Sequence, residues 1–173
     1  DKIDYKKKIG ADINEYLICF WNAIQKGWLP PKHITKEEYY YIKDNKDEDK
    51  KLTLWAGICC SFKGKWFGGY TGKINTEKEN RDYQKEAYSN VLKQIPNIKN
   101  VKFIHSDYKS LNIPPKSVIY CDPPYENTTK YKDNFNNKEF WNWCREKVKE
   151  GHYVYVSEYN APEDFVCIWQ KEV

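Results

Sequence analysis

The sequence predicts an α/β fold in which a mostly parallel sheet is covered by helices. Short apolar segments of strand character alternate with helical segments through the second half of the chain. This alternation is typical of parallel strands, because each strand needs a crossover, usually a helix, to reach the next. The 173 residues are enough for one ordinary domain with a sizeable core. The hydrophobic content of 40% and the aromatic content of 17% exclude a disordered chain.

The first predicted elements are a strand and a helix. Residues 8–12 form a short strand that ends in Asp12. Asn14 is the expected N-cap of a helix over residues 15–26, in which apolar residues recur on one face. Gly27 is a natural stop for this helix.

A proline break and a short helix are expected next. Pro30 is followed directly by a second proline, and two successive prolines interrupt regular structure. Thr35 and Glu38 form a capping box for a helix that runs to about residue 42. The mixed charges of residues 43–51 predict a solvated loop or the end of that helix.

Residues 58–98 predict an irregular hairpin and then a long helix. Glycines are interleaved with aromatic residues between positions 58 and 73, which is typical of a loop or an irregular hairpin. Thr76 and Glu79 form a second capping box, for a helix over residues 77–95. Pro96 and the asparagine after it are expected to end this helix.

The last part of the chain predicts four strands and one helix. The strands are expected at residues 101–104, 117–121, 153–157 and 165–169. Asn137 is the expected N-cap of the helix, and Gly151 its stop. Four of its residues are expected to face inward: Phe140, Trp141, Cys144 and Val148.

Composition limits the kinds of partner. The formal net charge is +4, and the stretch from Lys51 to Thr76 holds four lysines and no acid, which favours a polyanionic partner.

The three histidines lack zinc-ligand spacing, so no metal site is expected. No apolar run approaches the ~20 residues of a membrane span. The six cysteines form no C-x-x-C pair and are interpreted as reduced thiols of a cytoplasmic protein.

The segment with the clearest chemistry is residues 118–125, an apolar strand followed by Asp122, Pro123, Pro124 and Tyr125. Ligands of open α/β sheets bind outside the carboxyl ends of the strands, where Asp122 is expected. The prolines stiffen the turn and remove two backbone donors, so a carboxylate and a rigid carbonyl remain as paired acceptors. Such a pair suits an amino group with two N–H donors, and Tyr125 offers a face for stacking on a base. Accepting both hydrogens localises the nitrogen lone pair and makes the amine nucleophilic.

This segment resembles the D-P-P-Y signature of amino-group methyltransferases. The wider pattern resembles the Dam-type adenine methyltransferases, and more closely their phage and prophage relatives, over most of the chain. The matching segments occur in one order along the chain: residues 11–14, 60–70, 106–108, 122–125 and 157–160. The resemblance implies a Rossmann-like, S-adenosylmethionine-dependent methyltransferase core that is interrupted by a mostly helical insertion.

The resemblance also implies roles for acidic residues that follow strands. Asp12, with Ile13, would hold the ribose hydroxyls of S-adenosylmethionine. Asp107, with Tyr108, would accept from the amino group of the cofactor's adenine, and Asp122 would also lie at the cofactor. The alternative for Asp12 is a role in capping the helix after it. The alternative for Asp107, and for Asp122, is a structural role in a turn.

The insertion is expected to recognise double-stranded DNA. By resemblance, residues 1–27 and 99–173 form the catalytic core, and residues 28–98 form the target-recognition insertion. Lys63, Lys65 and Lys73 are expected to meet phosphates, while Trp66 and Tyr70 contact a base or fill the duplex. The alternative is an ordinary loop whose aromatic rings pack inward. A base inside a duplex cannot reach Asp122, so it would have to be extruded.

The family's glycine-rich first motif is expected upstream of the strand at residues 8–12 and is not part of this sequence. We interpret this as truncation; the alternatives are a second chain that supplies the motif, or an inactive protein. The predicted function is methylation of the exocyclic amino group of adenine in DNA, in a bacterial or phage-infected cell and in a restriction–modification setting. The alternatives are RNA adenine or a protein amide as the acceptor, or an inactive DNA-binding remnant.

Overall fold

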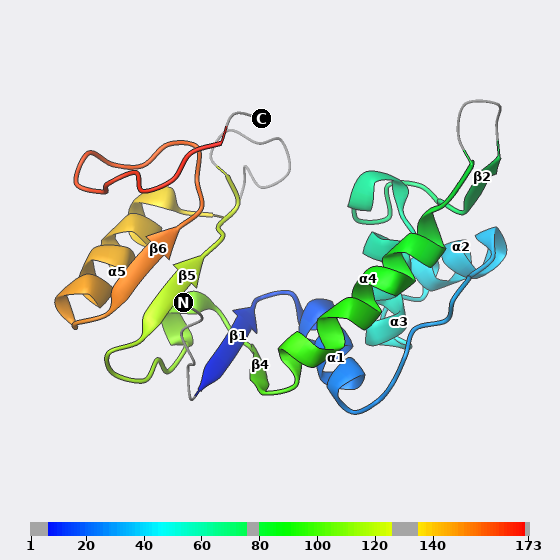
Figure 1. Cartoon of the computed structure of the whole chain (residues 1–173), viewed down its shortest axis with the longest axis horizontal. Coiled ribbons are helices and arrows are strands. Elements are labelled where there is room, and N and C mark those ends of the chain that lie inside the picture. Colours follow the sequence, from blue (N-terminus) through cyan, green and yellow to red (C-terminus); the bar gives the residue numbers. More distant parts are fainter. Residues whose placement is uncertain (1–6, 76–79, 126–134, 172–173) are drawn as a thin grey trace. The chain divides into compact units, whose positions relative to one another are not determined.

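The computed structural model describes residues 7–75, 80–125 and 135–171. The chain divides into two compact units, Asp1–Leu111 and Asn112–Val173, and Figure 1 labels most of their helices and strands. The first unit contains β1 (Lys8–Asp12), α1 (Glu15–Gln25), α2 (Lys36–Asp44), α3 (Lys50–Leu54), the π-helical turn η1 (Trp55–Cys59), the 3-10 turn η2 (Phe62–Gly64), β2 (Lys73–Asn75), β3 (Asn80–Asp82), α4 (Tyr83–Ile98), β4 (Val101–His105) and the 3-10 turn η3 (Tyr108–Ser110). The second unit contains β5 (Val118–Cys121), α5 (Asn137–Lys149) and β6 (Tyr153–Val156). Parallel strands with helices beside them confirm the α/β class.

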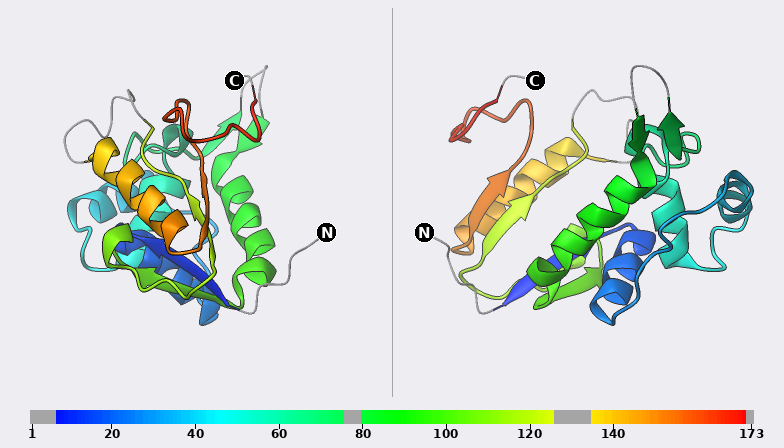
Figure 2. Two further views of the ribbon diagram at one scale, coloured as in Figure 1. Left: turned by 90° about the vertical axis from the view of Figure 1, so that its left-hand side faces the viewer. Right: turned by 45° about the vertical axis from the view of Figure 1, so that its right-hand side comes forward.

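The pair β1–β4 is parallel, and its register runs from Lys8 opposite Val101 to Asp12 opposite His105. Helix α1 lies against this pair in Figure 2, and the ring of Trp21 stacks on Phe103 with 6.2 Å between centroids. Gly10 permits the approach of β4, because a Cβ there would meet the Phe103 ring at 2.9 Å. The predicted strands at residues 8–12 and 101–104 are therefore confirmed.

The capping residues in the sequence predicted the first residues of two helices correctly. The side chain of Asn14 accepts from the amide of Leu17 and caps α1, and Gly27 follows this helix with a φ of 91°, in the region that glycine favours. Thr35 and Glu38 form the predicted capping box at α2. Both caps satisfy amides of the helix's own first turn, without help from the rest of the fold.

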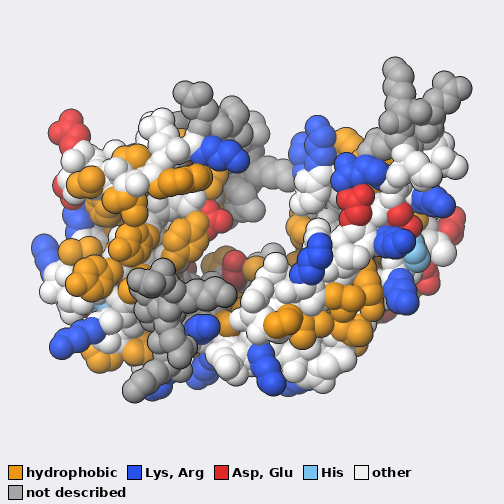
Figure 3. All heavy atoms as spheres, viewed as in Figure 1, with side chains coloured by type: hydrophobic (Ala, Val, Ile, Leu, Met, Phe, Trp, Pro, Cys, Tyr) orange, Lys and Arg blue, Asp and Glu red, His pale blue; other side chains and the backbone are white. Residues whose placement is uncertain are grey.

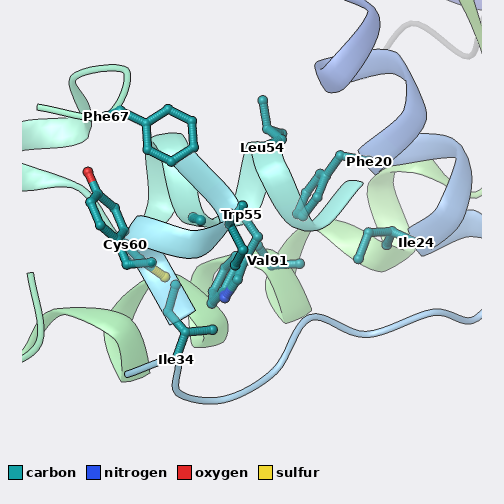
Figure 4. Packing of buried hydrophobic residues seen from close by; sticks show 11 residues of the cluster. Phe20, Ile24, Ile34, Leu54, Trp55, Cys60, Phe67 and Val91 are labelled. Atoms are coloured by element: carbon teal, nitrogen blue, oxygen red, sulfur yellow. The ribbon is translucent and has the colours of Figure 1, made fainter. Parts of the chain in front are cut away.

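The core of the first unit is a cluster of side chains from α1, α2, α3, η1 and α4 (Figure 4). Trp55, Tyr39 and Phe20 are its largest fully buried members. The sequence interpretation missed α3 and η1, because it treated residues 43–51 as a loop or helix end. Helix α2 does end at Asp44, but Asp49 then caps α3 by accepting from the amide of Leu52 at 3.1 Å.

The long helix begins later than predicted. Thr76 and Glu79 lie outside the described residues, and Asn80–Asp82 forms β3, which pairs with β2 in an antiparallel hairpin. The side chain of Asp82 accepts from the amide of Lys85, so Asp82 is the N-cap of α4. The helix also continues through Pro96 to Ile98. A proline so near the end removes a hydrogen bond from the final turn only.

In the second unit, β5 and β6 are parallel, from Val118 opposite Tyr153 to Cys121 opposite Val156, and α5 packs on them. These strands confirm the predictions at residues 117–121 and 153–157. The other face of the pair carries exposed side chains, and Figure 3 shows hydrophobic groups gathered over these strands. They are Val118, Tyr120, Tyr153 and Tyr155.

Three predictions for this unit were wrong. Asn136, and not Asn137, caps α5, by accepting from the amide of Glu139 at 3.1 Å. Val148 is 51% exposed, whereas Trp143 is buried beside the other predicted inward residues. Residues 165–169 form no strand; Phe165 packs on Trp141 at 4.7 Å instead. A β-branched pattern does not make a strand without a neighbour to pair with.

Among residues 7–75, 80–125 and 135–171, no helix has the length and apolar character to cross a bilayer. Within the same ranges, no three His, Cys, Asp or Glu residues are grouped to hold a metal ion. All six cysteines are free thiols. Burial raises the pKa of the Cys59 thiol to about 11.

Candidate active site

Asp12 and Asp107 lie at the carboxyl ends of two neighbouring parallel strands. Asp12 is the last residue of β1 and is opposite His105, the last residue of β4. The amide of Ser106 donates to the carbonyl of Asp12 at 3.1 Å, which extends the pairing one residue past β4. Asp107 therefore follows directly after the end of the ladder, as the sequence predicted.

The turn after β1 is held by the carboxylate of Asp12. Its Oδ1 accepts from the amide of Asn14 at 2.7 Å, which sets the path from β1 into α1. Ile13, between them, is 71% exposed. The carbonyl of Ile13 is 2.9 Å from Nε2 of His105, so the turns after β1 and β4 are joined.

Asp107 has the same relation to the turn after β4. It is the N-cap of η3, and its Oδ1 accepts from the amide of Lys109 at 2.8 Å. Asp107 and the neighbouring Tyr108 are half-buried. Both carboxylates thus build their own turns, as the structural alternatives expected. A carboxylate has about four acceptor sites, so this does not exclude a ligand, and the cofactor roles stay predictions.

In the second unit, Asp122 follows β5 and its side chain is exposed. The interpretation of Asp122 as a group that receives a substrate required this exposure. Pro123, Pro124 and Tyr125 are half-buried. The phenol of Tyr125 hydrogen-bonds with the Ser157 hydroxyl at 3.0 Å, so the ring is tied to the segment after β6.

Two residues after β6 contact this site, and their roles were not predicted. Ser157 is held by its amide, which donates to the carbonyl of Cys121 at 2.9 Å. Tyr159 meets Tyr125 in a T-shaped contact with 4.8 Å between centroids, and it is 64% exposed. The signal was the match of residues 157–160 to the family pattern, but chain order alone does not show that β5 and β6 are neighbours.

The segment with the predicted DNA-binding residues is an irregular hairpin, as predicted. Ser61 and Tyr70 form an isolated antiparallel bridge. Lys63 and Lys65 are exposed within it, and Lys73 is exposed in β2.

The two aromatic residues predicted to contact DNA are partly used in packing. Trp66 is 38% exposed, and its ring lies 5.4 Å from Tyr16 and 4.9 Å from Phe67. The hydroxyl of Tyr70 donates to the carbonyl of Ile34 at 3.0 Å, and Tyr70 is half-buried. The DNA-binding assignment therefore stays a prediction, with the lysines more available than the rings.

A groove of about 600 Å³ lies elsewhere in the first unit, between the residue 31–34 segment, α2 and the start of α3. None of the predicted site residues lines it. Its lining includes four acidic residues and no lysine or arginine: Glu37, Glu38, Glu48 and Asp49. This lining is opposite in charge to the irregular hairpin of residues 58–73, which exposes Lys63, Lys65 and Lys73 and is called the lysine-bearing hairpin below.

In β5 and the residues after it, a parallel strand leads into an exposed acid, two prolines and a tyrosine, which is the arrangement expected of the D-P-P-Y signature of the amino-group methyltransferases. The chain belongs to the family of D12 class N6 adenine-specific DNA methyltransferases, whose model matches residues 1–171. It is also similar to the Type II methyltransferase M.FokI of Planomicrobium okeanokoites, with 28% identity over 172 residues and 83% of this chain covered. The chain spans about a quarter of that relative's length.

Proposed function

We propose that this chain is part of an S-adenosylmethionine-dependent enzyme that methylates the exocyclic amino group of adenine in double-stranded DNA. The observation that carries the proposal is the exposed Asp122 at the end of β5, followed by two prolines and by Tyr125 with a restrained ring. The family match supports the same acceptor, and the Type II methyltransferase relative supports methyl transfer. That relative also favours a restriction–modification setting, in the cytoplasm of a bacterial or phage-infected cell.

The first unit has groups that suit the cofactor. Two carboxylates at adjacent strand ends, Asp12 and Asp107, would accept from its ribose hydroxyls and its adenine amino group, as acids after strands do in nucleotide-binding folds. Exposed Ile13 and half-buried Tyr108 would give apolar contact with the adenine ring. The cofactor supplies an electrophilic methyl group. This assignment fits a Rossmann-like core, with residues 28–98 as the target-recognition insertion.

The second unit would hold the methyl acceptor. The Asp122 carboxylate and the Pro123 carbonyl accept the two N–H groups of the adenine amine. Neither Pro123 nor Pro124 has an amide hydrogen, so neither competes for these acceptors. Tyr125 stacks on the extruded base. Together these contacts orient the amine and localise its lone pair, without a covalent enzyme intermediate.

The experiment is methyl transfer from labelled S-adenosylmethionine to DNA, RNA and a glutamine-containing peptide. Transfer to DNA, with N6-methyladenine as the product, is expected. Asp122→Ala is expected to abolish transfer and to leave DNA affinity within about twofold of wild type. Transfer to RNA alone, or to the peptide alone, would show that DNA is not the methyl acceptor. Loss of DNA binding in Asp122→Ala would contradict the role of Asp122.

A further inference from the structure

Strands β5 and β6 end side by side, and this brings the segment after β6 to the D-P-P-Y segment. Cys121 is opposite Val156 in the register, so Asp122 and Ser157 are the next pair. The hydrogen bond from the Ser157 amide to the Cys121 carbonyl, 2.9 Å long, continues the ladder to this point. The backbone of Ser157 is therefore fixed by the sheet.

The Ser157 side chain restrains the far end of the Tyr125 ring. Its hydroxyl is 3.0 Å from the phenol oxygen of Tyr125, and both residues are half-buried. A tyrosine ring turns about two side-chain torsions, and a hydrogen bond at its tip opposes rotation about χ1, which would carry the phenol oxygen away. Holding the ring before a ligand arrives lowers the entropy that binding costs.

Tyr159 braces the same ring from the side. Its centroid is 4.8 Å from that of Tyr125, and the planes cross at 68°. The backbone amide of Tyr159 donates to the Glu158 carboxylate at 2.8 Å. Tyr159 is nevertheless 64% exposed, which is a large aromatic surface next to a residue proposed to stack on a base.

We propose that Ser157 is a positioning residue for Tyr125 and that Tyr159 is a second aromatic contact of the extruded base. This inference rests on the proposed function and adds two residues to its base-binding site. Ser157 acts through Tyr125, and it sets how well the base is held rather than the rate of methyl transfer. Tyr159 acts directly, since every base has a face or an edge that an aromatic ring can contact.

The test is steady-state methylation of DNA by the protein and its variants. Ser157→Ala is expected to raise the KM for DNA about fivefold, the effect of one lost hydrogen bond, with kcat within twofold of wild type. Ser157→Thr keeps a hydroxyl and is expected to restore the wild-type KM. Tyr159→Ala is expected to raise KM about tenfold, and Tyr159→Phe to leave it unchanged, because stacking needs only the ring.

Ser117→Ala is the matched control. The Ser117 hydroxyl donates to the Pro114 carbonyl at 2.6 Å, immediately before β5, so this change removes a comparable hydrogen bond at the opposite end of that strand. Its KM is expected to equal that of wild type. A second readout is the fluorescence of 2-aminopurine placed at the methylated position, which should show weaker stacking in Ser157→Ala and in Tyr159→Ala.

A double-mutant cycle distinguishes loss of the hydrogen bond between Ser157 and Tyr125 from general misfolding. Tyr125→Phe removes the partner of the Ser157 hydroxyl, so adding Ser157→Ala to it should change KM no further. Additive losses, or a wild-type KM in Ser157→Ala, would overturn the positioning role. A wild-type KM and unaltered 2-aminopurine fluorescence in Tyr159→Ala would overturn the second contact. If the full-length wild-type enzyme that contains this chain transfers no methyl group to DNA, the proposed function itself fails.

Discussion

The side-chain amide of Gln84 binds both backbone groups of Ile34. Its Oε1 accepts from the Ile34 amide at 2.8 Å, and its Nε2 lies 3.2 Å from the Ile34 carbonyl and 2.8 Å from the carbonyl of Thr71. Gln84 is 1% exposed. One side chain of α4 therefore ties the segment before α2 to the end of the lysine-bearing hairpin.

Gln84→Leu is expected to lower the free energy of unfolding by about 2–3 kcal/mol. The leucine fills much of the same volume but leaves the Ile34 amide and the Thr71 carbonyl without their partner in a buried site, which is the costly way to lose hydrogen bonds. The Ile34 carbonyl keeps the hydrogen bond from the Tyr70 hydroxyl. Urea denaturation measures the change. Gln94→Leu, on an exposed position of the same helix, is the control and should stay within about 0.5 kcal/mol of wild type. Equal losses in the two variants would contradict this account.

Tyr39→Phe is expected to loosen the hairpin without unfolding the unit. The Tyr39 hydroxyl accepts from the Gly69 amide at 3.2 Å and lies 2.8 Å from the Ser61 hydroxyl, so it joins α2 to both sides of the hairpin. Its loss should cost about 1 kcal/mol and speed hydrogen exchange at Gly69 several-fold. Tyr40→Phe, at a ring that is 43% exposed, is the matched control. An unchanged Gly69 exchange rate in Tyr39→Phe would show that the hydroxyl does not hold the loop.

The features that the sequence predicted well depend on neighbours along the chain. The caps at Asn14 and Thr35 and the acids that end strands are of this kind. The predicted strand at residues 165–169 is wrong because a strand also needs a neighbour to pair with, and the residues of the segment do not show whether one exists. The link between Gln84 and Ile34 spans 50 positions, and that between Tyr125 and Ser157 spans 32. Only the arrangement of the strands and helices shows such contacts.

The cap of α3 is expected to respond to acid. Burial raises the pKa of the Asp49 carboxyl, but the hydrogen bonds from Lys51 and from the Leu52 amide lower it by more, so the net pKa lies below the ordinary value of 3.8. A carboxyl with a lowered pKa in the folded state stabilises the fold above its unfolded pKa, and this stabilisation disappears as the pH falls through the folded pKa. The difference in unfolding free energy between wild type and Asp49→Asn should therefore shrink below about pH 4. Asparagine is chosen because it also caps helices.

Lys51→Gln is the companion variant for this pH dependence. Replacing the Lys51 ammonium group removes its 2.6 Å ion pair with the Asp49 carboxylate, so the pKa of Asp49 should rise. Against this background, the stabilisation from Asp49 should be smaller near neutral pH and should be fully lost at a higher pH than in wild type, because the folded-state pKa moves toward the unfolded one. An identical pH profile in both backgrounds would show that Lys51 does not set the charge state of the cap.

The lysines of the hairpin are expected to carry the salt dependence of DNA binding. Lys63, Lys65 and Lys73 are exposed, and each lysine that neutralises a phosphate releases about one counterion. Single changes of these lysines to glutamine should each reduce the slope of log affinity against log salt by about 0.9. Lys93→Gln, at an exposed position of α4, is the charge-matched control and should leave the slope unchanged. Equal reductions in all four variants would indicate a diffuse effect of net charge, and they would remove the hairpin from the DNA-binding surface.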